Sequence, residues 1–160
     1  MRHLILWALS TSLLVAACGG GGDGPGDAVL AMFDALKAGD GATVVSYMST
    51  GALEDMETQL ALLKTDPETA ASQLALMGVQ IDAAEIPDMT AARFAEVLFS
   101  SEMISGIMST AEVSIGEVIV EGESAMVEVT TSILDDTETH TIEVVREDGV
   151  WKVTELGMNI

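Results

Sequence analysis

The sequence is poor in basic residues, and this scarcity excludes one large class of partners. Only 6 lysines and arginines stand against 26 aspartates and glutamates, which gives a formal net charge of −20. Proteins that bind nucleic acid carry basic patches that neutralise phosphates, so nucleic acid is excluded as a partner. An anionic membrane surface would also repel the domain. Because the acidic residues are spread along the whole chain, we interpret them as a solvated surface in preference to a site for a basic partner.

Aromatic and metal-ligating residues are also scarce. Aromatic residues make up 4% of the chain, whereas aliphatic residues and methionine are plentiful, which predicts an aliphatic core. The methionines are spread along the chain and mostly fall at positions where apolar residues recur. We therefore interpret them as side chains that fill the core and not as a Cu(I) site. Asp135, Asp136 and Glu138 could collect a calcium ion weakly, but they are more typical of a solvated hairpin turn. We therefore expect no metal and no cofactor.

Residues 1–17 have the pattern of a secretory signal peptide. A short basic start, Met1-Arg2-His3, is followed by an uncharged and mainly apolar run from Leu4 to Ala17. A helix that spans a membrane needs about 20 apolar residues, and this run is shorter. A basic start, a short apolar run and small residues before a cleavage point are typical of secretion.

The end of this run resembles the bacterial lipobox. Val15, Ala16 and Ala17 precede Cys18, which is the single cysteine of the chain. The resemblance implies that the Cys18 thiol receives a diacylglycerol, that a signal peptidase cuts before it, and that the new amine is often acylated. A secreted chain with one cysteine cannot form an internal disulfide, and lipidation accounts for it. The alternative is an ordinary signal peptide with a chance cysteine near the cut.

A glycine-rich tether follows the predicted lipid anchor. Residues 18–26 comprise Cys18 and a stretch in which glycine holds most positions, and such a stretch behaves as a flexible linker. By resemblance to enterobacterial lipoproteins, glycine at position 19 favours export to the outer membrane. We expect the domain on the periplasmic face of the outer membrane in a Gram-negative host, or on the outer face of the cytoplasmic membrane in a Gram-positive one.

Residues 27–160 are long enough to form one domain with a real core, and its first part predicts helices. Val29, Met32, Phe33 and Leu36 fall on one face of a 3.6-residue period, which predicts a helix over 28–38. Asp27 is its expected N-cap and Gly39 its expected C-cap. Further helices are predicted over 42–48, over 53–65, over 67–78 with Asp66 as N-cap and Pro67 at N1, and after the cap Thr90, ending near 101–109.

After residue 110 the apolar residues alternate with a period of two, which predicts strands. The expected strands cover 112–120, 125–134, 138–146 and 150–156, and Gly116 is expected to mark a bulge. Short turns join them, and Asp148-Gly149 is a strong hairpin signal. Helices first and strands afterwards predict an α+β domain, in which N-terminal helices pack on one face of a four-stranded antiparallel sheet.

Both ends of this domain resemble the nuclear transport factor 2-like (cystatin-like) superfamily. The first end is the helical segment 29–40 followed by Tyr47-Met48, and the second is the hairpin segment 147–153. The resemblance implies a curved sheet that wraps helices around a conical pocket. Some relatives are isomerases, cyclases or dehydratases, and many only bind or assemble. The isomerase-like relatives use a pocket carboxylate as base and a tyrosine as oxyanion donor.

Three functions follow, and we favour the non-catalytic one. The first is a lipid-anchored envelope domain that binds an apolar ligand or a protein. The second is an isomerase-like or cyclase-like enzyme with Tyr47 as the donor, although Tyr47 is more typical of a core aromatic. Its carboxylate is unidentified, because Asp40 is better explained as a turn residue. His140 could act as a general base, as histidine side chains do near neutral pH, but it is more typical of an exposed strand position.

The third function is assembly of a homodimer through an exposed face of the sheet. Strand residues with apolar side chains are the candidates for this face. They are Val127, Val129, Ile142, Val144, Trp151 and Val153.

Overall fold

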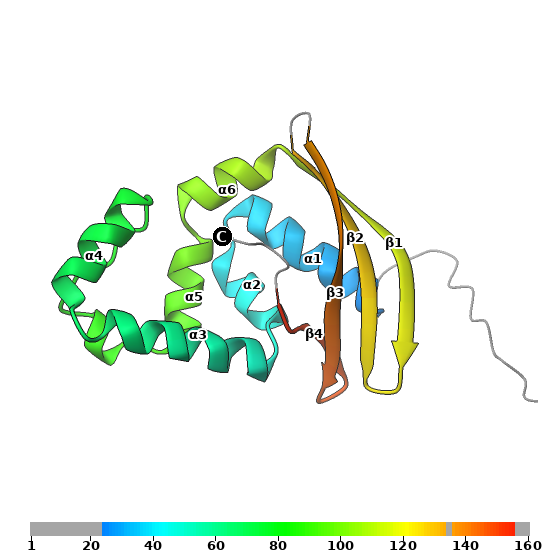
Figure 1. Cartoon of the computed structure of the whole chain (residues 1–160), viewed down its shortest axis with the longest axis horizontal. Coiled ribbons are helices and arrows are strands. Elements are labelled where there is room, and N and C mark those ends of the chain that lie inside the picture. The colour runs from blue at the N-terminus through cyan, green and yellow to red at the C-terminus, as the bar shows by residue number, and fades with distance from the viewer. Residues whose placement is uncertain (1–23, 134–135, 156–160) are drawn as a thin grey trace, which may run out of the picture.

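The computed structural model describes residues 24–133 and 136–155, which form helices first and then one sheet (Figure 1). The elements are α1 (Pro25–Ala38), α2 (Gly41–Tyr47), α3 (Thr50–Leu63), α4 (Pro67–Leu76), the 3-10 helix η1 (Ile86–Asp88), α5 (Ala91–Phe99), α6 (Glu102–Ser109), β1 (Ala111–Glu121), β2 (Ser124–Ile133), β3 (Asp136–Glu147) and β4 (Val150–Val153). The predicted α+β class is confirmed. Within the described ranges, no helix is long and apolar enough to cross a membrane.

Helix α1 is the centre of the fold. Its predicted apolar face is buried, with Val29, Met32 and Leu36 fully inaccessible, and it packs between the sheet and helices α2 and α6. The helix begins earlier than predicted, because Asp27 lies inside its first turn. There its carboxylate accepts a hydrogen bond from the backbone N–H of Gly24 (3.2 Å). The predicted C-cap is confirmed, since Gly39 has a φ of 67°.

Polar side chains set the start of the later helices. Each cap accepts a hydrogen bond from the backbone N–H three residues on, which satisfies one of the free donors of the first turn. The capping residues are Asp40, Ser49, Asp66, Thr90 and Ser101. The caps predicted at Asp66 and Thr90 are confirmed, whereas the start of α3 predicted at Leu53 is wrong. The side-chain hydrogen bond from Thr43, followed by its backbone N–H, holds the pKa of Asp40 below its usual range.

The sheet is an antiparallel meander in the order β1-β2-β3-β4. The predicted bulge is confirmed, because Gly116 and Glu117 lie between the pairs Ile115–Val129 and Val118–Val127 and face Glu128 alone. A Cβ at Gly116 would lie against the Glu128 side chain, which is exposed and would have to move aside. The last strand ends at Val153, which is earlier than the predicted end at Leu156.

The two faces of the sheet differ sharply in chemistry. The inner face packs on the helices and carries the buried residues Ala125, Val127, Val129, Ile142, Val144, Trp151 and Val153. The prediction that six of these residues form an exposed dimer face is therefore wrong. The outer face carries hydroxyls and carboxylates instead, including the hydroxyl pairs Thr130–Thr139 and Ser132–Thr137, each at 2.9 Å. Because strand residues alternate between the two faces, these apolar side chains all point into the core and leave polar side chains on the outer face.

The crossing of α2 over α5 gives a test of this packing. Gly41 donates its N–H to the Ser100 hydroxyl (3.2 Å), and a Cβ on Gly41 would clash with the Glu96 carbonyl oxygen. We expect Gly41→Ala to lower the free energy of unfolding by about 2 kcal/mol, as overpacking of rigid backbone does. The matched control is Gly106→Ala in α6, where a Cβ meets no atom within 4 Å.

Because alanine has a higher helix propensity than glycine, the control substitution Gly106→Ala should raise the free energy of unfolding by about 0.5–1 kcal/mol. Urea unfolding of both variants measures the difference. Equal effects of the two substitutions would contradict the close crossing of α2 over α5.

Candidate functional site

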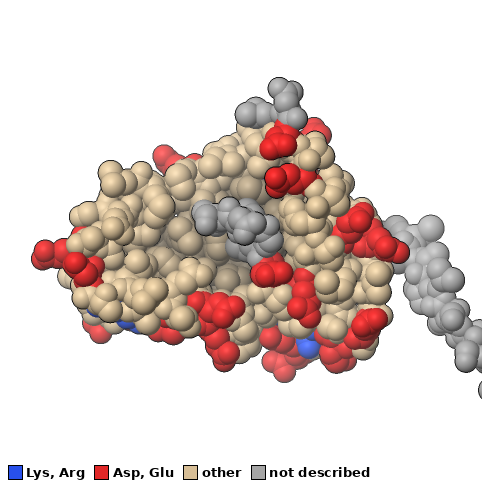
Figure 2. All heavy atoms as spheres, viewed as in Figure 1, with Lys and Arg blue, Asp and Glu red and all other residues tan. Residues whose placement is uncertain are grey.

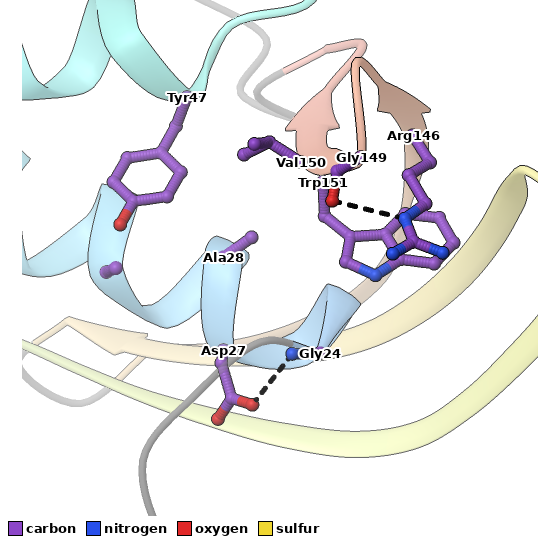
Figure 3. Close-up of a pocket in the computed structure, with 9 residues that line it drawn as sticks. Gly24, Asp27, Ala28, Tyr47, Arg146, Gly149, Val150 and Trp151 are labelled. Carbon is purple, nitrogen blue, oxygen red and sulfur yellow. Dashed lines mark hydrogen bonds between the residues drawn. The ribbon is translucent and has the colours of Figure 1, made fainter.

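A groove of about 510 Å³ lies between the start of α1, the end of α2 and the β3–β4 hairpin (Figure 3). We call it the hairpin groove. It is lined by Gly24, Asp27, Ala28, Ala31, Tyr47, Arg146, Gly149, Val150 and Trp151. The first turns of α1 form its floor, and Tyr47 faces the hairpin residues across it. The groove thus opens beside Gly24, the first residue that the structure describes.

One wall of the groove is built by the turn that the sequence predicted. Asp148 and Gly149 have φ values of 51° and 83°, the left-handed pair that favours an Asp-Gly hairpin. This turn places Arg146 opposite Trp151 in the strand register. The Arg146 guanidinium lies over the Trp151 ring, with its Cζ atom 5.9 Å from the ring centroid, and its Nε–H donates to the Gly149 carbonyl (3.2 Å). This wall of the groove therefore presents the Arg146 guanidinium together with the Trp151 indole ring.

The other wall is Tyr47, the last residue of α2. Its segment is fixed to the hairpin by hydrogen bonds that cross between the two walls. They run from the Ser49 N–H to the Val153 carbonyl (2.9 Å), from the Thr50 N–H to Glu147 Oε1 (2.9 Å), and from Lys152 Nζ to the Ser46 carbonyl. Because these bonds hold both walls, the width of the groove is set by the fold.

The groove lacks the pair of groups that proton abstraction requires. Tyr47 lines it, as the isomerase hypothesis needs, but the only carboxylate among the lining residues is Asp27. Asp27 is exposed and bound to the Gly24 N–H, and in Figure 3 its carboxylate points away from Tyr47. A general base and an oxyanion donor must converge on one substrate. The described residues that line the groove do not bring a carboxylate and Tyr47 together in this way.

His140 lies outside this groove, on the inner face of the sheet. It pairs with Val129 and is half-buried, so the prediction of an exposed strand position is wrong. Its Nε2 atom and the Thr131 hydroxyl are both buried and have no hydrogen-bond partner among the residues that the structure describes. Thr131 lies on the same face, since it is two residues beyond Val129 on β2. A buried polar atom without a partner costs about 1–3 kcal/mol.

Other predicted residues serve the fold. Asp40 caps α2, which confirms its interpretation as a turn residue. The interpretation of methionines as core filling is right for the buried Met32, Met48, Met56, Met89 and Met108, and wrong for the exposed Met77, Met103 and Met126. Within residues 24–133 and 136–155, no three histidine, cysteine or acidic side chains come together as metal ligands. The lipobox residues Val15, Ala16, Ala17 and Cys18 lie outside the described residues, as does Asp135.

A second, smaller groove of about 290 Å³ runs between α3, α5 and the end of β4. Its lining is mainly apolar and includes Met48, Met56, Leu98 and Phe99. None of its described lining residues is a lysine, an arginine or a tyrosine, so these residues offer fewer directed contacts than those of the hairpin groove. Comparisons of this chain with protein-family models, with curated proteins and with solved structures find no match.

Sequence reasoning missed Arg146 as a site residue and assigned Trp151 to a dimer face. The signal was present, because a two-residue turn at Asp148-Gly149 places these two side chains opposite each other. The sequence pattern did not indicate that α1 and Tyr47 lie against this hairpin.

The unpartnered hydroxyl of Thr131 leads to a stability test with a matched control one residue away. We expect Thr131→Val to raise the free energy of unfolding by about 1 kcal/mol, because it replaces a buried polar atom without changing its shape. Thr130→Val on the outer face should lower it by about 0.5 kcal/mol, because the hydrogen bond to Thr139 is lost. Thermal unfolding of both variants measures the shifts. A loss of stability in Thr131→Val would mean that its hydroxyl is satisfied in solution.

Proposed function

We propose that this chain is a lipid-anchored protein of the bacterial envelope whose domain binds a ligand and does not catalyse a reaction. The observation that carries this proposal is the hairpin groove. It presents Tyr47 opposite a stacked Arg146 and Trp151, and the one carboxylate in its lining is committed to a helix cap. Such a surface can hold a ligand but offers no paired acid and base.

The anchor and the groove are close in the chain. Gly24 lies on the edge of the groove, and the stretch from Cys18 to Gly24 reaches at most about 20 Å when fully extended. Diacylglycerol on Cys18 would therefore keep the groove near the bilayer surface. Two or more acyl chains give stable anchoring, whereas one chain is marginal. The envelope location follows from the lipobox resemblance and the glycine-rich tether.

The groove favours a ligand with an apolar or aromatic body and one anionic or carbonyl group. Arg146 uses its Nε–H within the hairpin, which leaves the terminal nitrogens of its fork for an acceptor on the ligand. The ion pairs of the described residues, Lys64–Glu57 and Arg93–Glu96, involve other cations. The aromatic ring of Tyr47 adds apolar contact area on the opposite wall.

The two alternatives are weaker on specific grounds. An isomerase-like or cyclase-like enzyme needs a carboxylate near Tyr47, and Asp27 does not fill that position. A dimer through the outer sheet face would bring Glu112, Glu128 and Glu143 of two copies together, and like charges repel. The order of helices and sheet supports the nuclear transport factor 2-like cone as a proposal for the finer architecture.

Tryptophan fluorescence tests the groove directly. Cleavage before Cys18 removes Trp7 and leaves Trp151 as the single indole, so its emission reports on the groove wall. The probe is 1-anilinonaphthalene-8-sulfonate, an aromatic anion, added to the purified mature protein. We expect quenching of Trp151 with energy transfer to the dye, and affinity about tenfold lower in Arg146→Gln and in Tyr47→Ala.

The matched control is Arg93→Gln, which removes an exposed arginine elsewhere. Equal affinity loss in Arg146→Gln and Arg93→Gln would show that the dye follows net charge alone. Binding that is unchanged in Arg146→Gln and Tyr47→Ala would remove the groove as the ligand site.

A further inference from the structure

Among the described strands, β1 stands at one end of the sheet order (Figure 1). It extends over Ala111–Glu121 and pairs with β2 on one side. On its other side, no described residue pairs with it in the sheet. The N–H and C=O groups that point outward from an edge strand are a template for another strand. Soluble proteins usually cover such an edge or protect it with charge.

The lower half of this edge strand also exposes apolar side chains. Val118, Ile119 and Val120 are 38%, 48% and 53% exposed. Since successive strand residues point to opposite faces, Ile119 lies on the outer face beside its exposed partner Met126, and the two valines lie on the inner face. The run past the bulge keeps a regular register with β2, from Val118 to Glu121. An exposed apolar edge strand is prone to pair with a strand of another chain.

The charged residues of β1 and β2 all have one sign. Glu112, Glu117 and Glu121 are exposed along β1, and residues 111–145 contain no lysine or arginine. On the side drawn in Figure 2, acidic residues gather around the lower end of the sheet, with a basic residue among them. A second copy of β1 would place glutamates against glutamates, which is destabilising. An anionic bilayer would be repelled for the same reason.

We propose that β1 binds an extended, basic segment of another protein as a fifth strand of the sheet. The backbone ladder along β1 supplies the hydrogen bonds, as in other cases of strand addition. On the outer face, lysine or arginine side chains of the segment lie beside Glu112, Glu117 and Glu121, and on the inner face its apolar side chains lie beside Val118 and Val120. This inference is independent of the hairpin groove, because none of these residues lines it.

The test uses a fluorescein-labelled peptide of eight residues in which lysine and valine alternate, added to the purified mature chain in detergent. Fluorescence anisotropy measures binding, and hydrogen exchange measures protection of the backbone amides. We expect binding that weakens at high salt, with slower exchange in residues 111–121. The double variant Glu117→Lys/Glu121→Lys should weaken binding at least tenfold.

Two controls separate strand addition from charge attraction. A fully N-methylated peptide of the same sequence keeps its charges but cannot form the ladder, and it should not protect residues 111–121. The variant Glu85→Lys/Glu102→Lys makes the same charge change away from β1, and it should bind nearly as well as the wild type. No binding of the lysine peptide, binding without protection of β1, or equal loss in both charge variants would overturn the proposal.

Discussion

The structure depends on the packing of one helix against the inner face of one sheet. Val29, Met32 and Leu36 of α1 are fully buried, and Val127 and Ile142 lie among the residues that face the helices. Full burial of each such side chain contributes about 1.5–3 kcal/mol. This packing decides which strand residues point inward, and it leaves hydroxyls and glutamates outside. It also fixes the start of α1, and with it Gly24, beside the β3–β4 hairpin.

The scarcity of aromatic residues makes their placement informative. Phe33, Phe94 and Phe99 fill the core among aliphatic side chains. Tyr47 and Trp151, by contrast, line opposite walls of the hairpin groove, and the Arg146 guanidinium lies over the Trp151 ring. A chain with a strong acidic excess thus places an arginine and two of its aromatic residues in one small region. This concentration is the basis of the proposal that the hairpin groove binds a ligand.

Many features of the fold are set by residues that are close in the sequence, and for that reason they could be predicted from the sequence. Asp66-Pro67, Thr90, Gly116 and Asp148-Gly149 each act through nearby backbone, so their roles could be predicted from the chain. Contacts between distant elements could not be predicted in this way. His140 and the six strand residues assigned to a dimer face alternate regularly, but periodicity does not say whether helices or a second subunit cover them. The groove was missed for the same reason, because it forms only where α1 meets the hairpin.

The mass of the mature protein extracted from membranes tests the central claim, a binding domain held at the envelope by lipid on Cys18. We predict a chain that begins at Cys18 and carries a diacylglyceryl group on the thiol. The corresponding Cys18→Ser chain should lack this mass and should keep residues 1–17. A mature chain with an unmodified thiol at Cys18, or one that begins after Cys18 and washes freely from the membrane, would contradict the account.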